Sequence, residues 1–137
     1  MALKEKILEV AGGPHPAAVA TLDGHLPAVR FMVLFGFPDM TFVGGTLKSS
    51  KKVAQLKKNP SVAISTWSGK EFSDPYVEMT AKGEVHEVLA TKKKYWNPMF
   101  EQFFKSPDNP DFVVLVFSAT EIVYHGPNMA SMDVWKR

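Results

Sequence analysis

Apolar and polar residues alternate with a period of two over most of this chain, which is the pattern of β-strands that bury one face. Asp23-Gly24 lies between the first two such stretches and is typical of a tight hairpin turn, because glycine accepts the positive φ that the turn requires. Gly83 predicts a bulge within a later strand. The predicted strands cover residues 17–22, 26–35, 41–45, 61–67, 76–88, 111–117 and 119–125.

Helices are expected in three places. Residues 1–10 mix charged and apolar side chains and end at Gly12-Gly13-Pro14, which stops a helix. Residues 51–58 are amphipathic, and residues 92–104 predict a helix in two pieces because Pro98 breaks it. Strands outnumber helices, and the gaps between them mostly suit antiparallel turns. The pattern therefore predicts a small closed or partly open barrel with covering helices.

The composition fits a single domain spanning residues 1–137, with 45% hydrophobic residues and a formal charge of only +2. Acidic residues are interspersed throughout, so nothing requires a nucleic-acid partner. The chain has no cysteine and its four histidines lack ligand spacing, so no metal site is expected. No apolar run is long enough to cross a bilayer, and no secretory signal is recognisable. A cytoplasmic protein without a membrane partner is expected.

A loop rich in hydroxyl groups and lysines opens the helix predicted over 51–58. Lys51 and Lys52 occupy its first turn, where the positive end of the helix dipole disfavours cations. A bound phosphate would reverse that effect, and the hydroxyls of Thr46, Ser49 and Ser50 together with free backbone N–H groups would bind it. In the alternative interpretation, the serines are ordinary N-cap residues and the lysines are simply solvated.

Arg30 stands inside the long apolar strand predicted over 26–35. A buried guanidinium without a partner is costly, so this position needs an explanation. The alternation places Arg30 on one face with Met32 and Leu34, and that face could lie against a flat ligand. Alternatively, Arg30 pairs with a carboxylate such as Glu78 or extends to the rim of the barrel.

In their order and spacing these motifs resemble the FMN-binding split-barrel proteins. These are the pyridoxamine 5′-phosphate oxidase-like flavoproteins, and the likeness is greatest to their short, general-stress-protein type. It rests on Arg30 to Leu34, Thr41 to Gly45, Ser50 to Lys52 and Asn59-Pro60, and it extends over most of the chain. The resemblance implies a mainly β fold, a six-stranded antiparallel split β-barrel of Greek-key topology with flanking helices.

The resemblance also implies which residues hold FMN. Backbone groups of Met32 to Leu34 would contact the polar edge of the flavin ring, Val43 to Gly45 would pass close to it, and Arg30 would approach the phosphate. Ser50 to Lys52 match the family's phosphate-binding hydroxyl and basic residues. No catalytic residue is assigned. The expected cofactor-binding set is Arg30, Met32, Val33, Leu34, Val43, Gly44, Gly45, Thr46, Ser49, Ser50, Lys51 and Lys52.

The sequence departs from the true pyridoxamine phosphate oxidases at several positions. Phe35 stands where a substrate-binding lysine is expected, and Asp133 to Arg137 lack the Arg-x-His pattern. Lys51 replaces the usual arginine, which keeps the charge but loses the bidentate fork. Oxidation of a B6 vitamer is therefore not expected.

Three functions are considered. The first is a small FMN-dependent oxidoreductase that acts on an unidentified small molecule with a nicotinamide or other reductant. The second is a flavin-binding protein without turnover, serving storage, sensing or electron relay. The third is a basic barrel that binds nucleic acid through Lys92 to Lys94, although three lysines on an exposed helix face are the simpler interpretation.

A homodimer is also implied, with each flavin in the crevice between two barrels. Trp96 or Trp135 is then expected to reach the flavin of the other subunit. The aromatic residues Trp96, Phe100, Phe103 and Phe104 are interpreted first as a packing cluster and second as a surface for the twin subunit.

Overall fold

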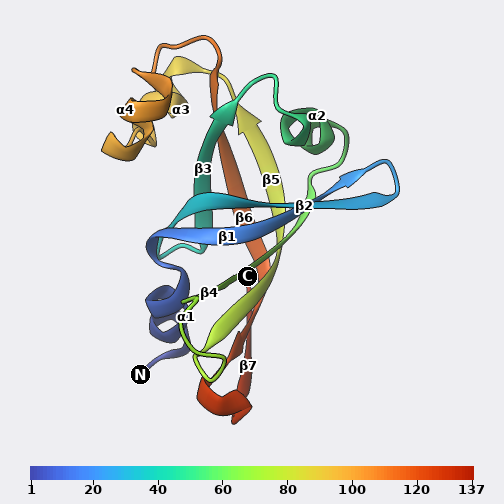
Figure 1. Cartoon of the computed structure of the whole chain (residues 1–137), viewed down its shortest axis with the longest axis vertical. Helices are drawn as coiled ribbons and strands as arrows, with labels where there is room; N and C mark the ends of the chain where they lie inside the picture. The colour runs from blue at the N-terminus through green and yellow to red at the C-terminus, as the bar shows by residue number, and fades with distance from the viewer.

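The computed structural model describes all residues of the chain, 1–137. Its seven strands form one antiparallel sheet in the order β3-β2-β1-β4-β5-β6-β7, and a further pairing of β3 with β6 closes six of them into a barrel (Figure 1). The expected six-stranded antiparallel barrel is confirmed. The strands are β1 (Gly13–Asp23), β2 (Leu26–Gly36), β3 (Thr41–Leu47), β4 (Ser61–Trp67), β5 (Tyr76–His86), β6 (Phe112–His125) and β7 (Met132–Lys136).

The long hairpin of β1 and β2 is built on the predicted turn. The two strands pair from Gly13 with Gly36 down to Asp23 with Leu26, so that Gly24 and His25 form the turn. Gly24 has a φ of +64°, which glycine adopts without steric cost. The turn therefore fixes the register of the two strands on which the candidate site depends.

The core has two parts. The larger cluster fills the barrel and includes Leu34, Leu115 and Phe117, all fully buried. The second lies outside the barrel, where Phe100 and Phe104 cover Phe112, Val114 and Val116. Both faces of the first half of β6 are therefore covered, which explains its unbroken run of apolar residues.

Four α-helices flank the barrel: α1 (Leu3–Ala11), α2 (Lys51–Lys58), α3 (Leu89–Lys94) and α4 (Pro98–Phe104). A short 3₁₀ turn, Pro127–Met129, precedes β7. Helices α1 and α2 lie at different ends of the barrel, and α3 and α4 lie together on its outside (Figure 1). None of the helices combines the length and the apolar character needed to cross a lipid bilayer.

The segment 92–104 is confirmed as two helices. Asn97 caps the second, because its side chain accepts a hydrogen bond of 2.9 Å from the Met99 N–H, and Pro98 occupies the first helical turn. The expectation of three exposed lysines in this segment is wrong, since Lys92 is only 4% exposed. Its ammonium donates to the Asn109 carbonyl instead.

Three strand predictions need correction. Residues 111–117 and 119–125 do not form two strands, because β6 runs unbroken through both. Strand β7 was not predicted. No bulge lies at Gly83: the register of β5 and β6 shifts between Thr80 and Ala81, where the extra residue is Thr120 of β6. Gly83 serves packing, since a Cβ there would lie 2.9 Å from Leu56 and 3.1 Å from Phe117.

The barrel is split between β2 and β3. These strands pair with each other only at Phe35 with Val43 and Gly36 with Phe42. On their other edges, β2 pairs along its whole length with β1, and β3 pairs along its whole length with β6. Beyond the two shared pairs, the facing edges of β2 and β3 have no strand partner, and their backbone groups are left available to a ligand.

Candidate functional site

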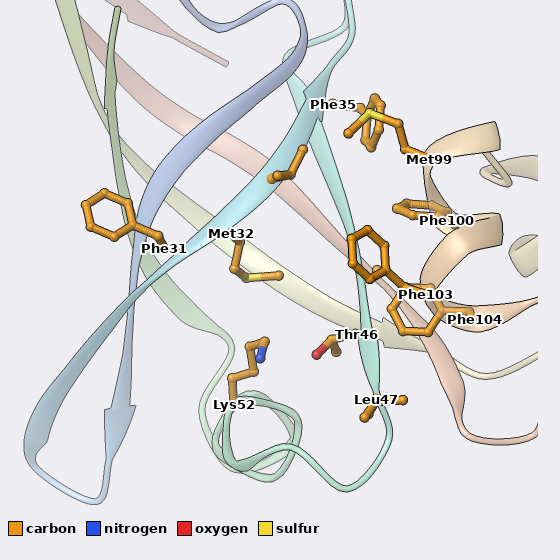
Figure 2. A pocket seen from close by; sticks show the side chains of 12 residues that line it. Phe31, Met32, Phe35, Thr46, Leu47, Lys52, Met99, Phe100, Phe103 and Phe104 are labelled. Carbon is orange, nitrogen blue, oxygen red and sulfur yellow. The ribbon is translucent and has the colours of Figure 1, made fainter. Parts of the chain in front are cut away.

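A cavity of about 420 Å³ lies in the split, with β2 and β3 on one side and α4 on the other (Figure 2). Helix α4 supplies four of its side chains, and most of the lining is apolar. The residues that line it are Phe31, Met32, Val33, Phe35, Gly45, Thr46, Leu47, Lys52, Met99, Phe100, Phe103 and Phe104. Ligand pockets in proteins span roughly 300–1,000 Å³, so this cavity is large enough for a flat organic molecule.

One end of the cavity is polar. Lys52 rises from the first turn of α2, and Figure 2 shows its side chain directed toward the space between β2 and Thr46. The Thr46 hydroxyl donates to the Ser50 hydroxyl at 3.4 Å. Ser50 occupies the N-cap position of α2, but its side chain makes no capping hydrogen bond, and the first turn holds no acidic residue. The start of α2 therefore retains free N–H groups and positive charge for an anion.

Arg30 lies beside this end of the cavity and is held by neutral groups. Its Nη1 donates to the Val19 carbonyl at 3.1 Å and to the Thr21 hydroxyl at 2.8 Å, and its Nη2 donates to the Gln55 side-chain carbonyl at 3.1 Å. The alternative of a Glu78 partner is wrong, because Glu78 pairs with His125 at 2.9 Å. Arg30 therefore keeps its full charge, although burial lowers the pKa of its guanidinium.

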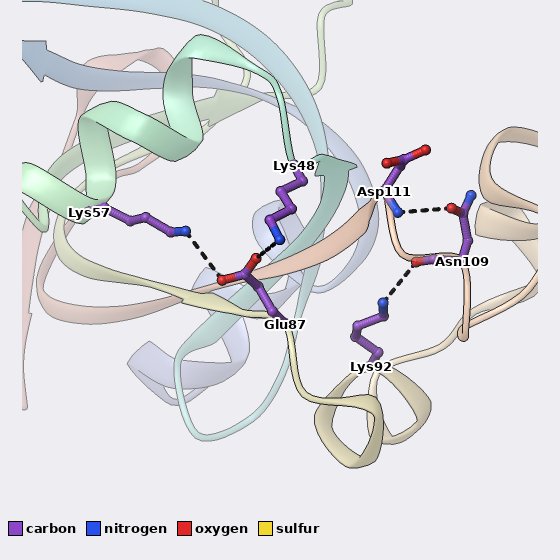
Figure 3. Close-up of polar contacts among 6 residues, drawn as sticks. All are labelled: Lys48, Lys57, Glu87, Lys92, Asn109 and Asp111. Carbon is purple, nitrogen blue, oxygen red and sulfur yellow. Dashed lines mark hydrogen bonds and ion pairs between the residues drawn. The ribbon is translucent and has the colours of Figure 1, made fainter.

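The basic residues around the site differ in whether a carboxylate balances them. Glu87 binds both Lys48 and Lys57, at 3.0 and 3.2 Å (Figure 3). No carboxylate pairs with Arg30 or Lys52. Burial lowers the pKa of Lys52, and repulsion from Arg30 lowers it further. Two like charges held together without an acid are costly to the fold, and an anion would relieve that cost.

The structure separates the expected site residues into four groups. Met32, Val33, Gly45, Thr46 and Lys52 line the cavity, and Arg30 and Ser50 lie next to its polar end. Ser49, in the loop before α2, and Lys51, the first residue of α2, are both exposed. Leu34, Val43 and Gly44 are buried, so only their backbone could meet a ligand.

Glycine at positions 44 and 45 has a packing reason. A Cβ on Gly44 would lie 3.0 Å from Leu34 and 3.1 Å from Met32, and one on Gly45 would lie within 3.2 Å of three phenylalanine rings. Side chains there would push β2 and α4 away from β3. The glycines thereby set the width of the split.

Sequence reasoning missed Thr21 and Gln55. Each is a polar residue on the buried face of its element: Thr21 follows the inward positions of β1, and Gln55 lies between Val53 and Leu56 in α2. The sequence signal that could have identified them is a polar residue at a position that the apolar pattern predicts to be buried. The apolar wall from α4 was missed for another reason, since its Phe100, Phe103 and Phe104 were assigned to packing or to a subunit contact.

A family model described as pyridoxamine 5′-phosphate oxidase matches residues 3–126. General Stress Protein 26 from Bacillus anthracis is 25% identical, with all of both chains covered and a TM-score of 0.82. A protein related to general stress protein 26 from Clostridium acetobutylicum is 20% identical over 96% of this chain and 89% of its own, with a TM-score of 0.76.

A pyridoxamine 5′-phosphate oxidase-related, FMN-binding protein from Nostoc punctiforme is 13% identical over 89% of this chain and 86% of its own, with a TM-score of 0.67. No curated protein sequence matches the chain. The match to the family model covers most of the sequence, and the structure has a split-barrel fold. This chain belongs to the pyridoxamine 5′-phosphate oxidase family.

Proposed function

We propose that this protein binds FMN in the cavity between β2, β3 and α4 and uses it as the redox cofactor of a small-molecule oxidoreductase. One observation carries the proposal: Arg30 and Lys52 lie near each other without a carboxylate partner, at the polar end of an apolar cavity. Membership of the family and the FMN-binding relative from Nostoc punctiforme support the same cofactor.

A phosphate suits the polar end in both charge and hydrogen bonding. Its negative charge would offset the repulsion between Arg30 and Lys52, which no protein group offsets. The uncapped start of α2 and the hydroxyls of Thr46 and Ser50 would supply further donors. These residues would hold the phosphate, and the remaining length of the cavity would then receive the rest of the molecule.

A flavin ring suits the remainder of the cavity. Its flat faces would meet apolar side chains such as Met32 and Phe100. The unpaired edges of β2 and β3 provide backbone N–H and C=O groups for the polar rim of the ring. Glycine at position 45 leaves that edge of β3 without a side chain.

FMN, when bound, supplies hydride or electron transfer, and the protein provides binding, orientation and exclusion of water. Lys52 is the only titratable side chain that lines the cavity. The protein therefore offers no acid–base pair beside the ring. This composition suits a substrate whose reduction needs no proton transfer from a side chain, with a nicotinamide as the reductant.

We propose further that two copies pair across the outer face of β2. Val29, Phe31 and Val33 form an apolar strip there, exposed by 69%, 81% and 45%. Phe31 and Val33 also line the cavity, and Val29 lines a second hollow over β1, β4 and β5. The strip is thus continuous with the site, and a second copy seated on it would cover the cavity's open side.

Heme and F420 are the competing ligands, because two other structures of this fold are described as a heme binding protein from Mycobacterium smegmatis and as an F420 reductase. A heme usually requires a histidine, cysteine or tyrosine as its axial ligand, or a methionine opposite a histidine. The cavity is lined by no histidine, cysteine or tyrosine. The side chains therefore favour a flavin over a heme.

The test begins with the purified protein and the chromophore released from it by heat. We expect the chromophore to be FMN. Titration of the stripped protein with FMN, riboflavin, F420 and heme should show the tightest binding for FMN, at least about tenfold tighter than for riboflavin, which corresponds to roughly 1.4 kcal/mol for the phosphate. Equal affinity for FMN and riboflavin, or tighter binding of heme or F420, would refute the proposal.

Turnover is tested separately with the FMN-loaded protein and NADH or NADPH in the absence of oxygen. Rapid loss of the oxidised flavin absorbance is expected for an oxidoreductase. Stable absorbance with both nucleotides would favour the second candidate, a flavin-binding protein without turnover. The absence of an acid–base pair in the cavity is the observation that keeps this candidate open.

A further inference from the structure

Gln55 has a neutral side chain and contacts the charged guanidinium of Arg30. It lies on the inward face of α2, is 9% exposed, and directs its carbonyl oxygen Oε1 toward the barrel. That oxygen accepts from the Thr21 hydroxyl at 2.5 Å and from Arg30 Nη2 at 3.1 Å. Because both neighbours donate, the amide can have only one orientation here.

The three side chains form a closed triangle. The Thr21 hydroxyl donates its only proton to Gln55 and accepts from Arg30 Nη1 at 2.8 Å. The second Nη1 hydrogen goes to the Val19 carbonyl. At this end of the guanidinium, both hydrogens of Nη1 and one hydrogen of Nη2 therefore donate to protein acceptors.

The other edge of the same guanidinium has no protein partner. Arg30 Nε makes no hydrogen bond in the structure, and Nη2 has one hydrogen left after its bond to Gln55. These two N–H groups lie in the plane of the guanidinium and point the same way from one edge, the arrangement that binds two oxygens of a phosphate or carboxylate together.

We infer that Gln55 is a positioning residue that presents the Nε–Nη2 edge of Arg30 to the ligand phosphate and, being neutral, leaves the arginine's charge available to it. This inference rests on the proposed binding of FMN. A carboxylate at position 55 would make the same two hydrogen bonds but would also neutralise Arg30. The amide at position 55 therefore matters because it is neutral and so preserves the positive charge of Arg30.

The experiment compares the affinity for FMN with that for riboflavin in the full-length protein, because only FMN carries the phosphate. In Gln55→Glu we expect folding to be retained and the preference for FMN to fall by about tenfold or more, as the new ion pair competes with the phosphate. Riboflavin affinity should stay unchanged. Ala54→Glu, on the exposed face of the same helix, makes the same change in net charge and should keep the preference.

Gln55→Met is the second variant, for the case in which Gln55→Glu does not fold. It keeps the volume of the side chain but removes the acceptor for Arg30, so the preference for FMN should fall here too. An unchanged preference in the folded variants, with a wild type that prefers FMN, would overturn this inference alone. A wild type that binds both flavins equally would instead overturn the proposed function.

Discussion

Gly45 lies so close to Phe100 that a Cβ on the glycine would stand 3.1 Å from the phenylalanine's Cε1 atom. The same Cβ would stand 2.9 Å from Phe112, closer than real Cβ contacts come. Helix α4 therefore approaches β3 to a distance that only glycine allows. Because α4 forms one wall of the cavity, this contact also sets how far the wall stands from the strands.

Replacement of Gly45 by alanine should destabilise the protein by about 1–3 kcal/mol, the usual cost of overpacking a well-filled core. Chemical denaturation measures the change. Phe100→Leu in the same chain should recover part of the loss, because the smaller side chain makes room for the methyl group. Equal stability of Gly45→Ala and wild type would show that the aromatic cluster yields without cost.

Lys52→Ala should weaken FMN binding by about 1.5–3 kcal/mol, the contribution of a hydrogen bond to a charged group. Lys51→Ala should have a smaller effect, because Lys51 is exposed and does not line the cavity. Lys58→Ala removes the same charge from the far end of α2 and serves as the control. Flavin fluorescence titrations give the three affinities, and a larger loss for Lys51 than for Lys52 would contradict the placement of the phosphate.

Phe31→Asp should convert the proposed dimer to a monomer, since a carboxylate would be buried at the centre of the apolar strip. Light scattering coupled to gel filtration measures the mass. Val88→Asp alters a similarly exposed apolar residue outside the strip, 67% exposed, and should leave the mass unchanged. A wild type that elutes as a monomer, with or without FMN, would count against pairing through this face.

His15 should make the protein less stable as the pH falls. Burial lowers the pKa of this histidine below its ordinary value of 6.5, and its Nε2 is buried without a hydrogen-bond partner. The unfolded chain therefore takes up the proton first, so stability declines from about pH 6.5 downward, by at most about 1.4 kcal/mol per pH unit. His15→Phe should remove this part of the pH dependence of the free energy of unfolding. The comparison is made at pH 7.5 and pH 5.5, roughly one unit to either side of the ordinary histidine pKa.

Lys92 should matter to stability far more than its neighbour. Its ammonium donates to the Asn109 carbonyl at 2.9 Å (Figure 3). The same ammonium lies 5.5 Å from the centre of the Phe112 ring. Lys92→Ala should cost about 1–3 kcal/mol through the lost hydrogen bond and the lost packing of its stem. Lys93→Ala, on the exposed side of α3, should change stability by less than about 0.5 kcal/mol. Thermal unfolding of the two variants makes the comparison.

The barrel was predictable because most of its strands bury one face each, and the alternation of apolar and polar residues records that face directly. Strand β7 was not, because its five residues are mostly exposed and carry no alternating pattern. The sequence predicted a break between two strands at the polar residue Ser118, but β6 continues through this position. Ser118 pairs with Thr41 of β3 and with Lys82 of β5, and this pairing on both edges overrides the local signal.

Within the candidate site, Lys52 was predictable because a cation in the first turn of a helix is unusual in any context. Gln55 was not, since its role depends on Thr21 and Arg30, which lie 34 and 25 residues away in the chain. Contacts at such separations leave no periodic trace in the sequence. Only the fold reveals that three polar side chains meet at the end of the barrel.

Strand β6 also has a consequence for synthesis on the ribosome. It supplies the partner for β3, β5 and β7, yet it begins only at Phe112. A nascent chain that has emerged only as far as β5 holds two strands whose edges await hydrogen bonds from residues still to be translated. Closure of the barrel therefore waits until β6 has emerged and its long-range contacts form, and until then the edges of β3 and β5 are exposed.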